Sequence, residues 1–290
     1  MTIFDRKLPN VLHRLALAIL AQIICAFPVA TWSQVPPSIP TCYEYIGRGH
    51  EEPPLGEELF VLIDQTVGFD KQIIPVIKQK IADWSKPGKR VSIIRFASNI
   101  GNRSVSGIFS VRLSPYGEES WKDWLKRSAR SRFERCERDQ PREALRRSLY
   151  AVEHALIESE RLIPKSDIIF SLQRTSEIIR ASNAKKKYVL VISDMLENSS
   201  SITFYSRGRI LVIDPAKTMS TVSKLGLISN FGGAKIFVYG TGYVAPVRGE
   251  KPYIGPKRMK PLVRFWTEYF SLSNSIVGEI GSPVLLGRID

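Results

Sequence analysis

Two apolar stretches of the sequence each end in an aspartate. Residues 59–63, LFVLI, run into Asp64, and Thr66 follows two positions later, while residues 185–194, KKKYVLVISD, end in Asp194. Continuous apolar runs of this length are typical of central parallel strands, which are covered on both faces. A carboxylate after such a run either marks the end of the strand or belongs to a site. Carboxylates and hydroxyls brought together would bind a hard divalent cation through oxygen.

The elements that must position these residues alternate between strand and helix patterns. Strands are predicted at 59–63, 91–96, 104–113, 185–194 and 234–240, with a short one at 209–214, and helices at 74–84, 120–136, 141–161, 166–180, 215–228 and 258–272. The predicted fold class is α/β, with three layers and a mainly parallel central sheet that has helices on both faces. The weakly apolar strand 104–113 is expected to be an antiparallel edge strand. One domain over residues 58–290 accounts for all of these elements.

In open α/β sheets, ligands bind at the carboxyl ends of the strands. Asp64 and Asp194 would therefore meet at one rim if their strands are neighbours. With Ser166, in PKSDI, added to Asp64, Thr66 and Asp194, residues 58–272 resemble a von Willebrand factor A (vWA) domain. That family joins a DxSxS motif after the first strand to a threonine from a later loop and an aspartate after a later strand.

The vWA resemblance implies a metal-ion-dependent adhesion site and a protein partner that binds there. The implied metal ligands are Asp64, Thr66, Ser166 and Asp194, and the implied ion is Mg²⁺ or Mn²⁺. Gly68 stands where the family has its second serine, so the site is degenerate, and metal-bound and metal-free forms both stay open. Asp167 is a further candidate ligand, although capping of the helix that follows is the favoured role.

The function favoured by these observations is a non-enzymatic binding module. One alternative is a phosphatase similar to the haloacid dehalogenases, with Asp64 as nucleophile, but that family normally has a second aspartate where this chain has Thr66. The motifs GxSxG, HExxH and GxxxxGK[ST] do not occur in the sequence. A second alternative is that a basic surface binds nucleic acid, an anionic membrane or an envelope polymer.

The basic character of the chain supports an acidic partner or surface. The formal net charge is +14, and two segments concentrate the positive residues. Residues 121–147 hold ten lysines and arginines against five acidic residues. The second segment, 248–264, begins with Arg248, and Lys251 follows. These two residues belong to the Gly/Pro-rich loop 241–257 and are predicted to contact the partner beside the rim.

The first 33 residues are predicted to be a secretory signal peptide. Basic residues precede the apolar run at 15–30, and small residues follow it. The alternative is an uncleaved membrane anchor, since the run is close to the ~17 residues that span a bilayer. The mature protein would be periplasmic or secreted, and residues 34–57 would form an extended, proline-rich lead-in.

Two cysteines follow the predicted signal peptide, at Cys42 and Cys136. Cysteines in an oxidising compartment can pair, so we predict a disulfide between them. Two independent thiols are the alternative. The bridge would tie the lead-in to the basic segment 121–147.

Overall fold

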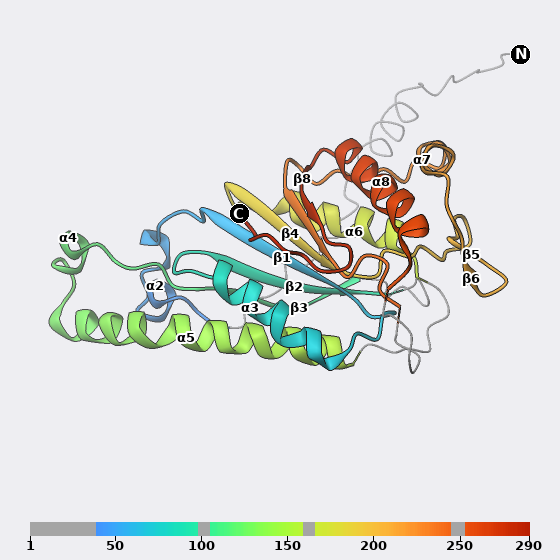
Figure 1. The fold of residues 1–290 in the computed structure, drawn as a ribbon. Helices are drawn as coiled ribbons and strands as arrows, with labels where there is room; N and C mark the ends of the chain where they lie inside the picture. Colours follow the sequence, from blue (N-terminus) through green and yellow to red (C-terminus); the bar gives the residue numbers. More distant parts are fainter. Residues whose placement is uncertain (1–38, 98–104, 159–165, 245–252) are drawn as a thin grey trace, which may run out of the picture. The chain divides into compact units, whose positions relative to one another are not determined.

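The computed structural model describes residues 39–97, 105–158, 166–244 and 253–290, which belong to one compact unit (Figure 1). Its strands are β1 (Glu57–Asp64), β2 (Arg90–Phe96), β3 (Val105–Arg112), β4 (Lys186–Ile192), β5 (Tyr205–Ser206), β6 (Arg209–Ile210), β7 (Lys235–Tyr239) and β8 (Ile276–Ile280). Its helices are α2 (Cys42–Tyr45), η1 (Gly49–Glu51), η2 (Lys71–Ile73), α3 (Ile74–Trp84), α4 (Glu119–Lys122), α5 (Arg127–Ile157), α6 (Ile168–Ala181), α7 (Pro215–Lys224) and α8 (Pro256–Leu272).

The central sheet has six strands in the order β3-β2-β1-β4-β7-β8. All neighbouring pairs are parallel except β2 and β3, which are antiparallel and place β3 at an edge. The predicted fold class is confirmed, including the antiparallel edge strand. The sequence order of the six strands follows the 3-2-1-4-5-6 pattern of doubly wound sheets, which reverses between β1 and β4.

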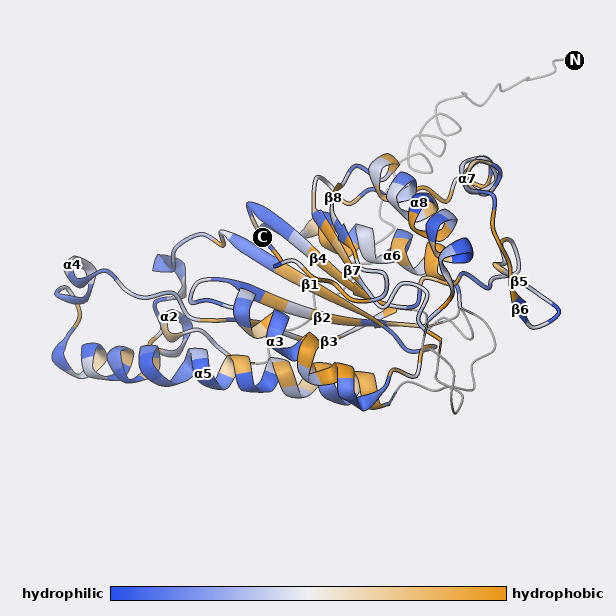
Figure 2. Cartoon of the chain, viewed as in Figure 1, coloured by the Kyte–Doolittle hydropathy of each residue, from blue (hydrophilic) through white to orange (hydrophobic). Residues whose placement is uncertain are grey.

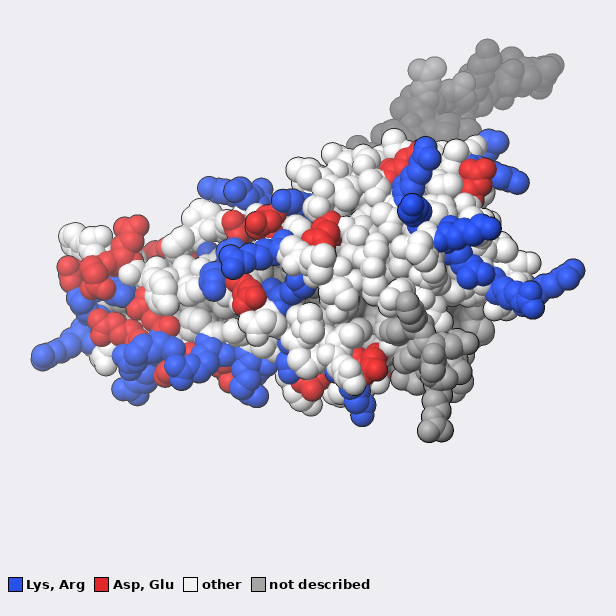
Figure 3. Space-filling model, in the orientation of Figure 1, with Lys and Arg blue, Asp and Glu red and all other residues white. Residues whose placement is uncertain are grey.

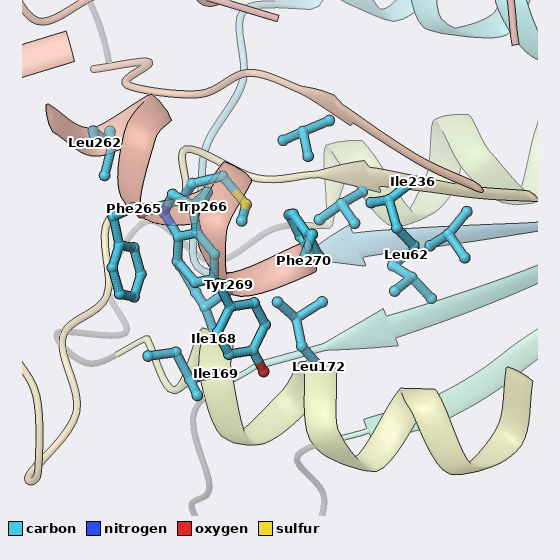
Figure 4. Packing of buried hydrophobic residues seen from close by; sticks show 14 of the residues in the cluster. Leu62, Ile168, Ile169, Leu172, Ile236, Leu262, Phe265, Trp266, Tyr269 and Phe270 are labelled. Carbon is cyan, nitrogen blue, oxygen red and sulfur yellow. Dashed lines mark hydrogen bonds between the residues drawn. The ribbon is translucent and has the colours of Figure 1, made fainter. Parts of the chain in front are cut away.

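Both faces of the sheet are covered, because alternate residues of each central strand point to opposite sides. On β1, Phe60 and Leu62 belong to the apolar cluster of α6 and α8, and Leu59 and Val61 to the cluster of α3 and α5. Hydrophobic residues are concentrated in the strands and on the inner sides of the helices (Figure 2). Figure 4 shows the first cluster, in which Trp266 and its aromatic neighbours on α8 fill the space between the sheet and α6.

Helix α5 is one continuous helix of 31 residues, so the prediction of two helices at 120–136 and 141–161 is wrong. Pro141 lies inside it, and an interior proline removes one backbone hydrogen bond. Gln140 anchors the helix at this point, because its side chain accepts from Ser114 N (2.8 Å) and donates to Arg112 O (2.9 Å). Buried positions three or four residues apart also continue on both sides of the proline. The short helix α4 begins at Glu119, one residue before the first predicted range.

The amino half of α5 extends past the sheet and packs with α2 and α4, which together we call the α2–α5 lobe (Figure 1). The lobe has a small core of its own, formed by Tyr43, Trp121 and Phe133, whose ring centroids lie 4.9–5.0 Å apart. The predicted disulfide between Cys42 and Cys136 is confirmed and closes this core. The bridge adds a covalent link to a cluster that holds few buried apolar side chains.

Other predicted elements match closely or differ by a few residues. Helix α3 has the predicted bounds, whereas the strand predicted at 209–214 is only the two-residue β6, paired with β5 in a separate hairpin. Strand β8 was not predicted, because its residues are half-exposed and lack a continuous apolar run. Within the described ranges, the structure has no helix that is long and apolar enough to cross a membrane. The predicted signal peptide lies outside those ranges.

Candidate functional site

The carboxyl ends of β1 and β4 form the rim where the strand order reverses. Ile63 pairs with Ile192, so Asp64 lies opposite Ser193, and Asp194 comes one residue later. In doubly wound sheets this reversal leaves a crevice at the carboxyl ends of the two strands. The alternation of the sheet therefore brings the two predicted aspartates to the same rim.

Asp64 is the centre of a hydrogen-bonded cluster. Its side chain is fully buried at 0% exposure. Its Oδ1 accepts from the backbone N–H of Thr66 (2.9 Å) and from the Thr66 hydroxyl (2.6 Å), and its Oδ2 accepts from the Ser193 hydroxyl (2.7 Å). Both oxygens of this carboxyl group are thus held in fixed positions.

Ser166 joins the cluster from a segment a hundred residues away in sequence. Its Oγ lies 3.1 Å from the Thr66 hydroxyl. Backbone hydrogen bonds with Asn198, at 2.9 and 3.2 Å, hold Ser166 in place beside the segment that follows β4. The structure therefore brings Asp64, Thr66 and Ser166 into direct contact, with Asp194 beside them.

Asp194 occupies a tight turn after β4. Its Oδ1 accepts from Leu196 N (2.9 Å), and its carbonyl accepts from Gly242 N (2.8 Å) in the loop after β7. Met195 has φ of 59°, in the left-handed region that costs a non-glycine residue about 1 kcal/mol or more. The buried Trp266 of α8 donates its Nε1–H to the Met195 carbonyl (2.8 Å). This hydrogen bond holds the strained turn against the aromatic core.

The electrostatics of the rim favour neutral carboxyl groups or an added positive charge. Burial raises the pKa of Asp64, against the opposing effect of the hydrogen bonds from Thr66 and Ser193. Burial raises the pKa of Asp194 well above its usual range, and the charge of Asp64 raises it further. In the part of the chain that the structure describes, neither aspartate forms an ion pair with a lysine or arginine.

The two aspartates also affect the pKa of Tyr205. This half-buried residue of β5 has its pKa raised by burial first and then by the charges of Asp194 and Asp64. Because the charges of both aspartates affect it, the Tyr205 phenol lies near the rim, although it is eleven residues beyond Asp194 in sequence. The sequence offers no pattern that would have identified it.

A further acid near the rim, Glu197, is buried at the amino end of α6. Its Oε2 accepts from the backbone N–H of Ile169 (2.9 Å), and its side chain is 1% exposed. Burial raises its pKa to about 8, against the opposing effect of this hydrogen bond. Asp167 has no side-chain hydrogen bond to the first turn of α6, so its predicted capping role is wrong. Glu197 supplies the acceptor from a segment distant in sequence.

Two further rim residues escaped the sequence analysis. Ser193 lies directly before Asp194, and the pairing of β1 with β4 alone would have placed it opposite Asp64. Thr241, after β7, is fully buried, and its hydroxyl has no hydrogen-bond partner in the described ranges. The predicted partner contacts Arg248 and Lys251 lie outside the described residues.

The residues at the rim fit a hard divalent cation in their chemistry. Mg²⁺ prefers carboxylate, hydroxyl and water oxygens, and the rim offers two carboxyl groups with the hydroxyls of Thr66 and Ser166. A cation would also offset the mutual repulsion that raises the pKa of Asp194. No cluster of three or more His, Cys, Asp or Glu side chains suited to a metal occurs in the described ranges, so hydroxyls would have to complete the site.

No protein-family model and no curated protein matches the chain. Three solved structures with low similarity are an aerotolerance-related membrane protein from Bacteroides fragilis, the PilB minor pilin from Streptococcus sanguinis and the conserved hypothetical protein BatB from Bacteroides thetaiotaomicron. Their identities are 14%, 12% and 12%, and their TM-scores 0.33, 0.38 and 0.31. The matches cover 78%, 78% and 77% of this chain, and 92%, 57% and 91% of the other chains. At these values, none of the three assigns a function to the chain.

Proposed function

We propose that the chain is an exported, non-enzymatic binding module that recognises a protein partner in the cell envelope through the rim of Asp64, Thr66, Ser166 and Asp194. The observation that carries the proposal is the direct hydrogen-bonded contact of Asp64, Thr66 and Ser166 beside a second carboxyl group. These groups come from three separate segments, and the fold holds them at the reversal of strand order.

We further propose that Mg²⁺ or Mn²⁺ binds at this rim. The carboxyl groups of Asp64 and Asp194 and the hydroxyls of Thr66 and Ser166 would hold the ion. The bound ion would offer a coordination position to an acidic side chain of the partner. The residues of this chain orient the donors, because each oxygen of Asp64 is already fixed by a hydrogen bond.

The geometry of Asp64 supports binding over phosphatase chemistry. Phosphatases similar to the haloacid dehalogenases normally have a second aspartate where this chain has Thr66, and the Thr66 hydroxyl donates to Asp64 Oδ1 (2.6 Å). Hydrolysis of a generic phosphoester that is lost in Asp64→Asn would contradict this part of the proposal.

Thermal unfolding with Mg²⁺ or Mn²⁺ tests the metal. We expect millimolar cation to raise the melting temperature of the wild type, since a ligand at 100 times its Kd stabilises by about 2.7 kcal/mol. Asp194→Asn should abolish the shift and keep the fold, because the amide matches the neutral carboxyl group. Asp139→Asn, at an exposed position of α5, is the matched control and should retain the shift. An unchanged melting temperature in the wild type would rule out the metal.

Cross-linking in the envelope fraction tests the partner. We expect one specific protein to be captured by the wild type and by Asp139→Asn, and to be lost with Asp64→Ala. Capture that is the same in all three proteins would show that the partner binds elsewhere.

A further inference from the structure

The exposed face of α5 carries a row of arginines in the α2–α5 lobe. Arg132, Arg135, Arg138 and Arg142, which we call the arginine row, are three or four residues apart and therefore share one face of the helix. All four are exposed. At 1.5 Å per residue the row spans about 15 Å. Positive side chains gather along this part of α5 on the surface (Figure 3).

Among the described residues, the arginine row has no acidic partner, in contrast to Arg130, Arg146 and Arg147 of the same helix. Arg130 pairs with Asp123 and Glu134 at 2.5 and 2.8 Å. Arg146 and Arg147 both pair with Glu143, at 2.7 and 2.6 Å. In the described ranges, no ion pair or side-chain hydrogen bond involves the guanidinium groups of the row. Three acidic residues lie within its span. Glu134 pairs with Arg130 and Glu137 with Lys122, which leaves Asp139 as the acidic residue without an ion pair in the described ranges, so the row keeps a net positive charge.

A groove with an apolar wall runs beside the arginine row. It has a volume of about 350 Å³, and Ile39, Pro40 and Tyr45 form one side. Arg132 and Arg135 lie on the other side, where Cys136, Asp139, Gln140 and Glu143 also line the groove. Tyr45 is 61% exposed. The groove thus places guanidinium groups, which bind phosphate through two parallel hydrogen bonds, next to apolar side chains.

We propose that the arginine row and this groove bind the surface of a membrane that contains anionic phospholipids. The row would contact the phosphates, and the groove would take apolar atoms below a headgroup. Tyrosine suits this boundary because its ring is apolar and its hydroxyl polar. The surface is separate from the rim, which adjoins the other end of α5 through Gln65 Nε2 and Ala155 O (2.8 Å).

The apolar groove and the length of the preceding chain favour a membrane over nucleic acid. Binding to single strands relies on several aromatic rings that stack on successive bases, whereas the lining of this groove has one aromatic ring, that of Tyr45, beside Ile39 and Pro40. The apolar run at 15–30 ends nine residues before Ile39. In the uncleaved form, which is the alternative to the predicted signal peptide, the leader would keep Ile39 within the ~30 Å of the bilayer that nine extended residues can span.

Flotation with lipid vesicles tests the proposal on the full chain. The vesicles contain either phosphatidylcholine alone or equal parts of phosphatidylcholine and phosphatidylglycerol. Each basic residue near an anionic surface strengthens binding about fivefold. The quadruple Arg→Gln variant of the arginine row should therefore bind the anionic vesicles at least a hundredfold more weakly than wild type. Any contribution of the leader is the same in all variants and is measured on phosphatidylcholine.

The matched control removes four positive charges elsewhere, through Lys→Gln at the exposed positions 217, 224, 257 and 260 on α7 and α8. We expect this control to bind anionic vesicles within a few-fold of wild type. Equal losses in both variants would overturn the proposal, because they would indicate net charge alone. Stronger binding to duplex DNA than to anionic vesicles, lost with the arginine row, would overturn it in favour of nucleic acid. Equal melting temperatures of the variants would establish that each is folded.

Discussion

Replacing Glu197 with glutamine should change how the stability of the protein depends on pH. The carboxyl group has its pKa raised from 4.5 to about 8 in the folded state, because burial outweighs the hydrogen bond from Ile169 N. Between these two values the unfolded chain releases a proton that the folded chain keeps. The stability that this group confers is therefore complete below pH 4.5 and is lost as the pH rises to about 8.

The magnitude follows from the pKa difference. Each pH unit between the two pKa values lowers the free energy of unfolding by about 1.4 kcal/mol. The full interval would cost about 5 kcal/mol, and the step from pH 6 to pH 8 about 2.7 kcal/mol. Glutamine keeps an oxygen to accept from Ile169 N and carries no charge at any pH. The free energy of unfolding of Glu197→Gln should therefore fall less than that of wild type, by about 2.7 kcal/mol between pH 6 and pH 8 and by about 5 kcal/mol over the full interval. The variant should also be more stable than wild type at pH 8.

Urea unfolding at pH 5, 6, 7 and 8, followed by tryptophan fluorescence, measures this difference. The buried Trp266 on α8 makes the signal sensitive to the core. Asp64 and Asp194 also have raised pKa values, so part of the decline with pH should persist in the variant. Parallel curves for wild type and Glu197→Gln would refute the reasoning. They would mean that the backbone N–H groups of α6 stabilise the ionised carboxylate enough to offset its burial.

Three further changes test the elements that hold the rim and the lobe. Gly240→Ala should destabilise the protein by about 2–4 kcal/mol in thermal melts, since a Cβ would lie 2.8 Å from Phe69 and 2.9 Å from Ser193 O. The control Gly226→Ala is also at positive φ but in open space, and it should cost about 1 kcal/mol. Cys136→Ser should lower stability by about 2–5 kcal/mol, and a reductant should lower the wild type equally and leave the variant unchanged. Trp266→Phe should cost about 1–3 kcal/mol through its lost hydrogen bond, and an unchanged melting temperature would show that the turn after β4 holds without it.

The apolar runs made the central sheet predictable from sequence. Residues 59–63 and 185–194 read as buried strands because both faces of a central parallel strand are covered. Strand β8 was missed because an edge position exposes its side chains and leaves no such run. The division of α5 in two was wrong because Pro141 is a strong local signal for a helix start. The buried stripe on both sides of it, which depends on tertiary packing, outweighs that signal.

The candidate site was predictable where it lies at strand ends and not where it depends on packing. Asp64 and Asp194 follow apolar runs, so their strands located them. Glu197 and Tyr205 reach the neighbourhood through the turns after β4, and neither has a local pattern that indicates burial near an acid. Whether the rim holds a metal stays a prediction, since the sequence only supplies the donors.

The continuous helix α5 connects two surfaces of the protein, the arginine row and the rim. The helix is about 46 Å long at 1.5 Å per residue. The disulfide at Cys136 joins the amino half of α5 to α2. In the carboxyl half, the Ala155 carbonyl accepts a hydrogen bond from Gln65, which is next to Thr66. A tilt of this rod at the lobe would displace the loop that carries Thr66. If occupation of the arginine row favours one tilt, thermodynamic reciprocity requires that binding at the rim change the affinity of the row by the same factor.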